Sequence, residues 1–212
     1  FGSAGERCMA ISVAVCVGKK NAENLKTKLL EETSKLNVGP YTDIKSDFGP
    51  LNNKAHYEKV LGYIDTGEKE GAKLLADGRN FKKQGYENGY FVGPTIFEDV
   101  KPEMRIYKEE IFGPVLSMMT TETYEDALKL VNNHELGNGA AVFTKSGNIA
   151  KHFTENAQIG MIGVNVPIPV PVAYHSFGGW KRSLFGDHSM HGPEGISCLL
   201  YTSDAADEGL GV

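Results

Sequence analysis

The chain has 212 residues, of which 41% are hydrophobic and 23% are charged, and its formal net charge is −5. This length and composition are ordinary for a globular protein that buries a core without a disulfide scaffold. The acidic balance, with no basic block, argues against nucleic acid or an anionic membrane as a partner, and the chain holds no run of about 18 apolar residues that could span a membrane.

Three cysteines, Cys8, Cys16 and Cys198, show neither a CxxC spacing nor a paired spacing with histidine. This pattern argues against a zinc site and against a secreted disulfide framework, and it favours a reducing compartment. The chain begins at Phe1 rather than at methionine, so a targeting peptide upstream would not be visible in it.

In the first half of the chain, the β-branched run at residues 11–17 predicts a buried strand. Apolar residues at helical spacing predict one helix from about Ala22 to Leu36 and a second at residues 57–64. A short strand is expected at residues 73–75, and the glycines and polar residues of segment 77–90 indicate a loop or hairpin.

The second half alternates between the two kinds of element. Pro94 forbids a helix interior at residues 91–97, which are therefore expected to be extended. Strands are then predicted at residues 115–119, 140–143 and 161–164, with helices after the capping-box variant Thr123-x-x-Asp126 and around residues 149–153. This alternation predicts an α/β fold with a largely parallel sheet flanked by helices.

Three segments contain residues that could perform chemistry. In the first, FGSAGERC at residues 1–8, Cys8 follows glycines and stands directly after Arg7. A reactive thiol needs an open backbone setting and nearby positive charge, although a cysteine on its own is more often a small buried hydrophobic residue. The segment therefore makes Cys8 a candidate nucleophile and leaves the structural alternative open.

The second segment, KEEIFGP at residues 108–114, taken alone is typical of a charged turn before a strand. The third combines residues 160–171, GMIGVNVPIPVP, with residues 176–183, SFGGWKRS. Its alternating prolines force an extended path outside a sheet, and such a stiff loop forms either a pocket wall or a surface crossover.

Together these segments resemble the aldehyde dehydrogenase superfamily over residues 1 to about 196. Phe1, Gly5, Glu6 and Cys8 match the F-x-x-x-G-[QE]-x-C signature around the nucleophile, and EEIFGP and SFGG follow in the expected order. The strings RCMA, GYENG, FVGPT and GVNVPIPVP resemble more narrowly the CoA-acylating methylmalonate-semialdehyde dehydrogenases. The resemblance implies a catalytic domain that lacks the Rossmann-like NAD domain.

The resemblance also implies a mechanism. Cys8 attacks the aldehyde as a thiolate, and its backbone N–H, with an upstream asparagine, holds the oxyanion. NAD takes the hydride, and coenzyme A accepts the acyl group with loss of CO₂, giving propionyl-CoA or acetyl-CoA. Arg7 is expected to grip the substrate carboxylate with two hydrogen bonds, unless it is a surface arginine paired with Glu6.

Four further site residues follow from the resemblance. Glu110 is expected to accept hydrogen bonds from the nicotinamide ribose, with Glu109 a solvated neighbour, and Phe112 to pack near the nicotinamide ring. Asn165 and Phe177 are expected to line the substrate side, although Asn165 could instead satisfy loop backbone groups. His56 and His134 are expected to be solvated, and we see no Ser-His-Asp constellation.

The sequence also departs from the family. It has no glycine-rich dinucleotide loop, and the oxyanion asparagine and any general-base glutamate would precede Phe1. The choice between a CoA-acylating and a hydrolytic enzyme therefore rests on subfamily resemblance. Residues 197–212 resemble a translated sequencing adaptor; we expect them not to be natural protein, Cys198 not to be functional, and the family's oligomerisation strand to be lost.

The sequence is consistent with three functions: a CoA-acylating semialdehyde dehydrogenase, a hydrolytic aldehyde dehydrogenase, and a truncated pseudoenzyme that acts as an interaction module. The whole enzyme is expected to be a homo-tetramer, in the mitochondrial matrix of a eukaryote or otherwise in the cytoplasm. The chain alone is expected to be inactive because about half of the cofactor site would lie outside it.

Overall fold

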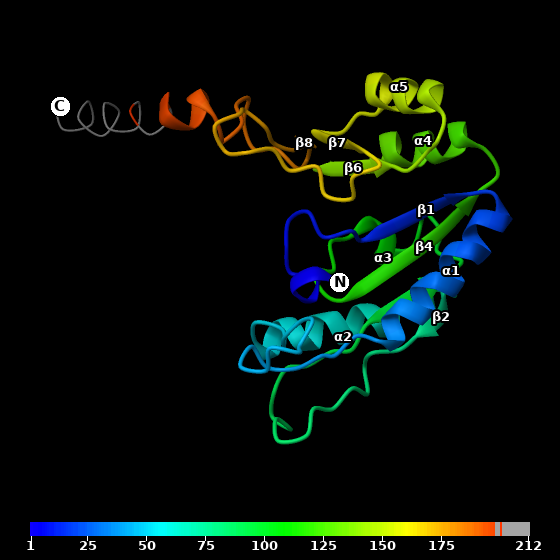
Figure 1. Ribbon diagram of the computed structural model, residues 1–212, viewed down its shortest axis with the longest axis vertical. Helices are drawn as coiled ribbons and strands as arrows, with labels where there is room; N and C mark the ends of the chain where they lie inside the picture. Colours follow the sequence, from blue (N-terminus) through cyan, green and yellow to red (C-terminus); the bar gives the residue numbers. More distant parts are fainter. Residues whose placement is uncertain (198–199, 201–212) are drawn as a thin grey trace. The chain divides into compact units, whose positions relative to one another are not determined.

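The computed structural model describes residues 1–197 and 200, which fall into two compact units. The first unit is formed by residues 1–127 and the second begins at Leu128 (Figure 1). The expectations for Cys198 and for nearly all of the tail from residue 197 concern positions outside the described residues.

The first unit contains a four-stranded sheet in the order β1-β4-β3-β2. The strands β1, β4 and β3 are parallel, and β2 is an antiparallel edge strand. The expected largely parallel sheet is therefore present here. The elements of this unit are η1 (Gly2–Gly5), β1 (Val13–Val17), α1 (Lys19–Ser34), α2 (Lys54–Lys69), β2 (Lys73–Ala76), β3 (Thr95–Glu98), α3 (Arg105–Lys108) and β4 (Val115–Thr121).

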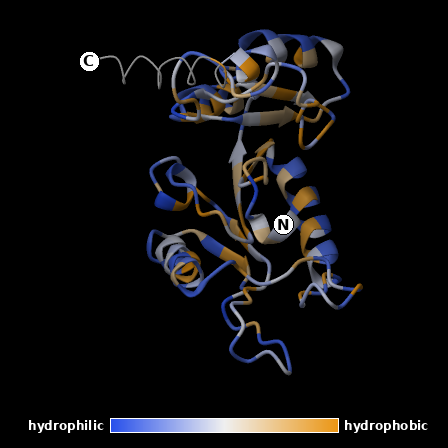
Figure 2. Cartoon of the chain, turned by 90° about the vertical axis from the view of Figure 1, so that its left-hand side faces the viewer, coloured by the Kyte–Doolittle hydropathy of each residue, from blue (hydrophilic) through white to orange (hydrophobic). Residues whose placement is uncertain are grey.

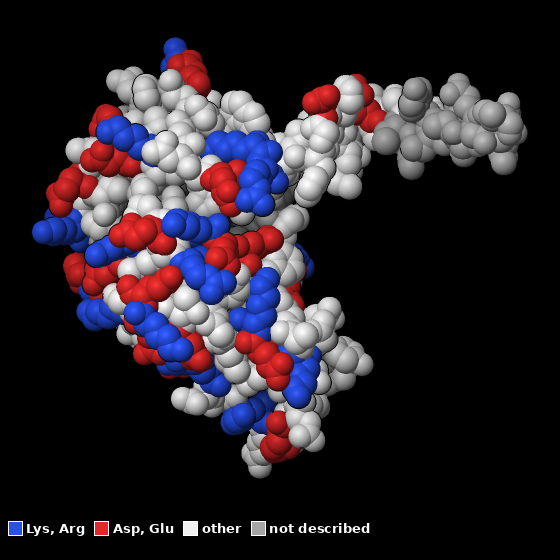
Figure 3. Space-filling model, turned by 180° about the vertical axis from the view of Figure 1, so that it is seen from behind, with Lys and Arg blue, Asp and Glu red and all other residues white. Residues whose placement is uncertain are grey.

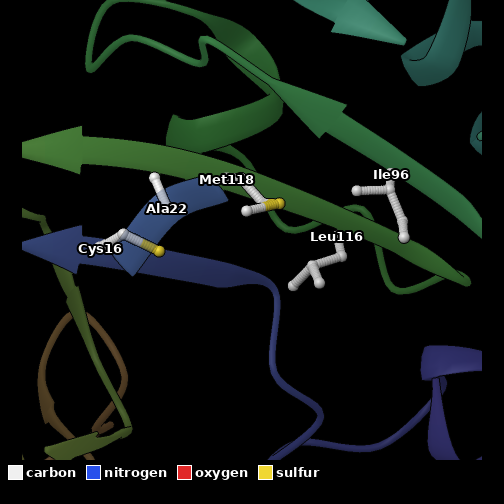
Figure 4. Packing of buried hydrophobic residues seen from close by; sticks show 5 residues of the cluster. All are labelled: Cys16, Ala22, Ile96, Leu116 and Met118. Carbon is white, nitrogen blue, oxygen red and sulfur yellow. The ribbon is translucent and has the colours of Figure 1, made fainter. Parts of the chain in front are cut away.

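Helices cover both faces of this sheet. Successive strand residues point to opposite sides, so the neighbouring residues Ile96 and Phe97 show which helix lies on each face. Ile96 packs in a cluster with Ala22 of α1, whereas a side chain on Gly67 of α2 would collide with the Phe97 ring. The helices α1 and α2 thus lie on opposite faces. Figure 4 shows the α1 side, where Cys16 of β1 and Leu116 and Met118 of β4 complete the buried cluster.

Local sequence explains where the helices begin and end. Asn53 caps α2 by accepting a hydrogen bond from the His56 N–H at 2.9 Å. The helix α1 ends at Ser34, so the predicted extension to Leu36 is wrong; there the N–H of Leu36 bonds the Thr33 carbonyl in a tighter turn. The helix α3 has only four residues, which is too short for helical periodicity to predict it.

The second unit is built around a parallel pair of strands joined by a helix. Its strand β6 (Gly139–Val142), helix α5 (Gly147–Asn156) and strand β7 (Met161–Val164) confirm the predicted alternation. The strands β5 (Leu136–Gly137) and β8 (Trp180–Lys181) form a separate antiparallel pair that the sequence analysis missed. The single run of strands expected from residue 115 is therefore divided, because β4 pairs with β1 and β3.

The helix α4 (Tyr124–Asn133) begins in the first unit and continues into the second. The predicted cap is confirmed, since the Thr123 hydroxyl accepts from the Asp126 N–H at 3.1 Å. At the other end, Lys181 Nζ donates to the carbonyls of Val131, Asn132 and His134. A lysine at this position suits the negative end of the helix dipole.

The distribution of charged side chains on the surface is consistent with the mixed charges of the sequence. Acidic and basic side chains are interspersed over the face seen in Figure 3, without a large patch of one sign. Hydrophilic residues occur along the loop between β2 and β3, as its glycines and polar residues predicted (Figure 2). Among the helices that the structure describes, none is long and apolar enough to cross a bilayer.

Candidate active site

Cys8 lies in a short turn that is exposed to solvent. The N–H of Ala10 bonds the Arg7 carbonyl at 3.0 Å, which places Cys8 inside the turn, and the thiol-bearing residue is exposed. Cys16, in contrast, is 6% exposed, and burial raises the pKa of its thiol. Of these two cysteines, Cys8 is therefore the one that solvent and a substrate can reach.

The segment before Cys8 follows an unusual path. Ser3, Ala4 and Gly5 adopt φ values of 52°, 56° and 74°, three successive left-handed residues. For Ser3 and Ala4 this conformation costs roughly 1–2 kcal/mol each. Ala4 is only 2% exposed, so the packing around it holds the strained path in place. We refer to residues 1–8 as the Cys8 segment.

The Cys8 segment contacts residues 108–114, which we call the Glu110 segment. A Cβ atom built on Gly5 would lie 2.0 Å from the carbonyl oxygen of Gly113, so the two backbones approach as closely as glycine allows. Gly113 in turn faces Val60 of α2, whose Cγ2 would lie 2.7 Å from an added Cβ. Two motifs that are about 100 residues apart in the sequence are thus brought together.

Within the Glu110 segment, the two residues expected to meet the cofactor differ in exposure. Glu110 is exposed, and its backbone carbonyl accepts from Lys59 Nζ at 3.4 Å. Phe112 is half-buried and has a φ of 60°, a strained value for a residue with a large side chain. Strain of this kind persists only where the surroundings impose it.

His56 supplies part of that restraint. Its Nε2 lies 2.6 Å from the Phe112 carbonyl oxygen and 3.4 Å from Oε1 of Glu6, and its ring meets the Phe112 ring edge-on at 6.3 Å. The His56 side chain is only 16% exposed. The expectation of a solvated histidine is therefore wrong, because the ring lies between the Phe112 carbonyl and the Glu6 carboxylate.

Glu109, the residue before Glu110, forms an ion pair with Arg105 and a hydrogen bond with Tyr63. Its carboxylate binds the Arg105 guanidinium through two hydrogen bonds of 2.7 and 2.9 Å and accepts from the Tyr63 hydroxyl at 2.7 Å. The Arg105 hydrogen bonds, followed by that of Tyr63, lower the pKa of Glu109 to about 2. Glu109 is exposed, as expected for a solvated neighbour, and its contacts also hold the end of α3.

Arg7 is exposed, next to Cys8. Among the described residues, no ion pair joins Arg7 to Glu6; the Glu6 carboxylate instead accepts from the Asn52 N–H at 3.2 Å and lies beside His56. The guanidinium of Arg7 is thus available to an anionic ligand from solvent.

Asn165 and Phe177 belong to the second unit. Asn165 has a φ of 56°, and its side-chain amide pairs with the Thr144 backbone, donating to the carbonyl at 3.0 Å and accepting from the N–H at 2.9 Å. This is the backbone-satisfying arrangement that the sequence left open. Phe177 stacks on His191 with ring centroids 4.3 Å apart. Their roles toward a substrate stay predictions.

The contact between Glu6 and His56 could not be predicted from the sequence motifs. The Asn53 cap at the start of α2 was the available signal, because it fixes the backbone N–H of His56. The contact with residue 112, 56 positions away, is set by the packing of α2 under Gly113. Over the residues that the structure describes, no three His, Cys, Asp or Glu side chains form a group that could hold a metal ion.

Comparison with known proteins identifies a family. A sequence model of the aldehyde dehydrogenase family matches residues 1–204. The chain is 54% identical over 196 residues to the malonate-semialdehyde dehydrogenase of Pseudomonas aeruginosa, and 48% identical to the human mitochondrial acylating methylmalonate-semialdehyde/malonate-semialdehyde dehydrogenase. These matches cover 92% of the chain but 39% and 36% of the relatives, so the chain spans well under half of their length.

Solved structures give the same assignment. A methylmalonate-semialdehyde dehydrogenase from Sinorhizobium meliloti 1021, in complex with NAD, is 56% identical, with a TM-score of 0.91 over 93% of the chain and 40% of that protein. A methylmalonate-semialdehyde dehydrogenase from Oceanimonas doudoroffii is 53% identical, with a TM-score of 0.90 over 92% of the chain and 40% of that protein. The α/β fold is thus shared with this family.

Proposed function

Because the chain belongs to the aldehyde dehydrogenase family, we propose that it forms part of an enzyme that oxidises malonate or methylmalonate semialdehyde with NAD and coenzyme A. The observation that carries the proposal is the contact between the Cys8 segment and the Glu110 segment at Gly5 and Gly113. It joins a candidate nucleophile to a candidate cofactor-binding carboxylate. The semialdehyde substrate is inferred from relatives with that name.

The residues of the Glu110 segment suit NAD. The exposed Glu110 carboxylate offers oxygen acceptors for the two ribose hydroxyls, and the half-buried Phe112 offers an aromatic surface for the nicotinamide ring. NAD, when bound, supplies the acceptor for the hydride. A relative of the same fold has been crystallised with NAD, which supports this choice.

Cys8 carries the covalent steps. Its thiolate attacks the aldehyde carbon and forms a thiohemiacetal, with the carbonyl electrons moving onto oxygen. Loss of hydride from that carbon leaves a thioester on Cys8. The coenzyme A thiolate then displaces the Cys8 thiolate. The substrate carboxylate leaves as CO₂, and the carbon that carried it takes up a proton, which gives acetyl-CoA or propionyl-CoA. The exposed position of Cys8 in the Arg7–Ala10 turn leaves room for both acyl acceptor and aldehyde.

Arg7 gives the proposal its substrate class. An aldehyde that also carries a carboxylate needs a cationic partner near the nucleophile, and a guanidinium matches a carboxylate with two parallel hydrogen bonds. Arg7 precedes Cys8 directly and is exposed. A hydrolytic aldehyde dehydrogenase is the second candidate function, since the acyl acceptor depends on groups outside the Cys8 and Glu110 segments.

A graft tests the function. Residues 1–196 would replace the matching segment of the Pseudomonas aeruginosa relative, to which this chain is 54% identical. We expect the graft to reduce NAD with malonate semialdehyde only when coenzyme A is present, and the Cys8→Ala graft to be inactive. Formation of free acid at the same rate without coenzyme A would favour the hydrolytic alternative, and an inactive but folded graft would contradict both.

A further inference from the structure

We propose that His56 is a positioning residue that links the Cys8 segment to the Glu110 segment. The proposal rests on the proposed function, because those two segments are taken as the nucleophile and cofactor sides of one site. Its basis is the pair of contacts made by a single atom. His56 Nε2 lies 2.6 Å from the carbonyl oxygen of Phe112 and 3.4 Å from Oε1 of Glu6, two residues before Cys8.

The chemistry of the partners defines the protonation of that atom. A backbone carbonyl oxygen only accepts hydrogen bonds, so Nε2 carries the hydrogen and donates it to Phe112. The Glu6 carboxylate lies beside the same N–H and is also an acceptor. The Nε2 atom of His56 thus bonds the Glu110 segment at Phe112 and lies 3.4 Å from the Glu6 carboxylate of the Cys8 segment.

The burial of the pair separates it from a surface contact. The side chains of His56 and Glu6 are 16% and 18% exposed, whereas Glu58, two residues further along α2, is 62% exposed. A hydrogen bond is stronger when it is shielded from water, and loss of the one from His56 would deprive the Phe112 carbonyl of that partner. His56 is therefore held more firmly than the exposed ion pairs of this helix.

Two further hydrogen bonds hold the backbone at the start of α2. The Asn53 cap fixes the backbone N–H of His56 at 2.9 Å, and the Glu6 carboxylate accepts from the Asn52 N–H at 3.2 Å. The start of α2 therefore bonds the Cys8 segment at Glu6, and His56 bonds the backbone of Phe112. The φ of 60° at Phe112 is strained and needs such a restraint from outside its own segment. Reaction rates depend steeply on alignment, so a link of this kind would set the distance between nucleophile and cofactor.

Amide hydrogen exchange in the 212-residue chain tests the link without any turnover. The apolar variant His56→Leu is expected to raise exchange by roughly fivefold in both the Cys8 and the Glu110 segments, the effect of one lost hydrogen bond on a local opening equilibrium. His56→Gln keeps an N–H donor and is expected to restore slow exchange in both. Glu58→Gln, which neutralises an exposed carboxylate on the same helix, is the matched control and should change neither.

A second variant keeps the test decisive if His56→Leu does not fold. Glu6→Gln retains an acceptor for Asn52 but removes the charge beside His56, and it should loosen the Cys8 segment alone. The proposal is overturned if Glu6→Gln leaves that segment unchanged, if His56→Leu affects neither segment, or if His56→Gln is as defective as His56→Leu. The last result would assign the effect to ring packing on Phe112.

The kcat and KM of the graft provide a second measurement, and a general loss of stability would change neither while the variants stay folded. At a temperature where all variants are folded, His56→Leu is expected to lower kcat with KM for the semialdehyde unchanged, and His56→Gln to restore kcat. If the unmodified graft is inactive, the proposed function fails, while hydrogen exchange still decides whether His56 links the two segments. If the graft is active and exchange is unaffected by His56→Leu, the function stands and the link is disproved.

Discussion

The two cysteines of the first unit provide an internal comparison at the scale of single residues. Cys8 is exposed, and Cys16 is buried with its pKa raised by desolvation. Because the thiolate is the reactive form, we expect iodoacetamide to alkylate Cys8 at neutral pH roughly tenfold faster or more than Cys16. Peptide mass spectrometry after timed labelling measures both rates in one sample.

The pH dependence of labelling sharpens this comparison. Burial favours the neutral Cys16 thiol, so its alkylation should increase only as the pH rises above its ordinary pKa of 9.0. Equal rates for the two cysteines at neutral pH would contradict the view that the Cys8 turn preserves a nucleophile.

Arg7 is the residue on which substrate preference is predicted to depend. In the graft, Arg7→Gln removes the charge that would pair with the substrate carboxylate and is expected to lower kcat/KM for malonate semialdehyde roughly tenfold to a hundredfold. Propionaldehyde, which has no carboxylate, serves as the control substrate and should be affected little. Equal losses for the two aldehydes would show that Arg7 acts on Cys8 rather than on the carboxylate.

At the scale of elements, Gly5 carries the contact between the two motif segments. Gly5→Ala meets a backbone conformation at φ 74° and a carbonyl oxygen 2.0 Å from the new Cβ. Because backbone must move to relieve this overlap, we expect a loss of more than about 2 kcal/mol in the free energy of unfolding. Urea denaturation followed by circular dichroism measures the loss.

Gly2→Ala is the matched control for that substitution. Gly2 lies in the same short segment, and nothing stands within 4 Å of a Cβ added there. We expect a change of less than about 0.5 kcal/mol, as for an unhindered surface position. If the two substitutions cost the same, the close approach of Gly5 and Gly113 does not stabilise this unit.

The end of α3 is predicted to contribute an acid-sensitive interaction. The pKa of Glu109 is lowered from its ordinary value of 4.5 to about 2, first by the Arg105 hydrogen bonds. A lowered folded pKa adds stability above 4.5, and this contribution is lost as the pH falls from 4.5 toward 2. The Glu109 side chain is 40% exposed, so solvent screening limits the contribution to less than about 1 kcal/mol.

Glu109→Gln tests that contribution. The difference in unfolding free energy between the original chain and the variant should shrink as the pH is lowered from about 5 to about 3, because the Glu109 carboxylate of the unfolded chain takes up a proton below its pKa of 4.5, whereas the folded chain keeps the charge until the pH approaches 2. Urea unfolding at several pH values gives the difference directly. A difference that does not change with pH would mean that the Glu109 interaction is not ionic.

Periodicity predicted the long elements and missed the short ones for a physical reason. The helix α2 shows several apolar residues at helical spacing. The four residues of α3 and the two-residue strands β5 and β8 are too short for a spacing to recur within them. The predicted extension of α1 to Leu36 had the right spacing but ignored the turn after Ser34. Such ends depend on capping and on neighbours in the fold.

The site could be predicted where residues are adjacent in sequence. The Arg7–Cys8 pair and the Glu110 segment were visible as motifs, but their meeting depends on Gly5, Gly113 and the placement of α2. His56 was assigned to solvent, because nothing near it in the sequence indicates a partner at residue 112. The side chain of Asn165 bonds backbone groups, which is one of the two alternatives that the sequence left open.

At the scale of the whole molecule, exposed apolar side chains lead to a prediction about solution behaviour. Tyr41, Ile44 and Phe185 are 95%, 98% and 95% exposed, and exposed apolar side chains that form a patch favour association with other apolar surfaces. We expect the 212-residue chain to bind a hydrophobic dye and to self-associate as its concentration rises. Replacing Tyr41 and Ile44 with serine should reduce dye fluorescence, and an unchanged signal would locate the apolar surface elsewhere.

The last prediction concerns catalysis by the chain alone. It spans 40% of the NAD-bound relative from Sinorhizobium meliloti, and we propose that it holds only part of the surroundings of a bound cofactor. Catalysis requires nucleophile, aldehyde and hydride acceptor to be aligned within ångströms, and a misplacement of about 1 Å costs roughly a hundredfold in rate. We therefore expect the purified chain to give no NAD reduction with malonate semialdehyde and coenzyme A, although Cys8 still reacts with iodoacetamide. Measurable turnover that disappears in Cys8→Ala would show instead that these residues suffice to bind the cofactor.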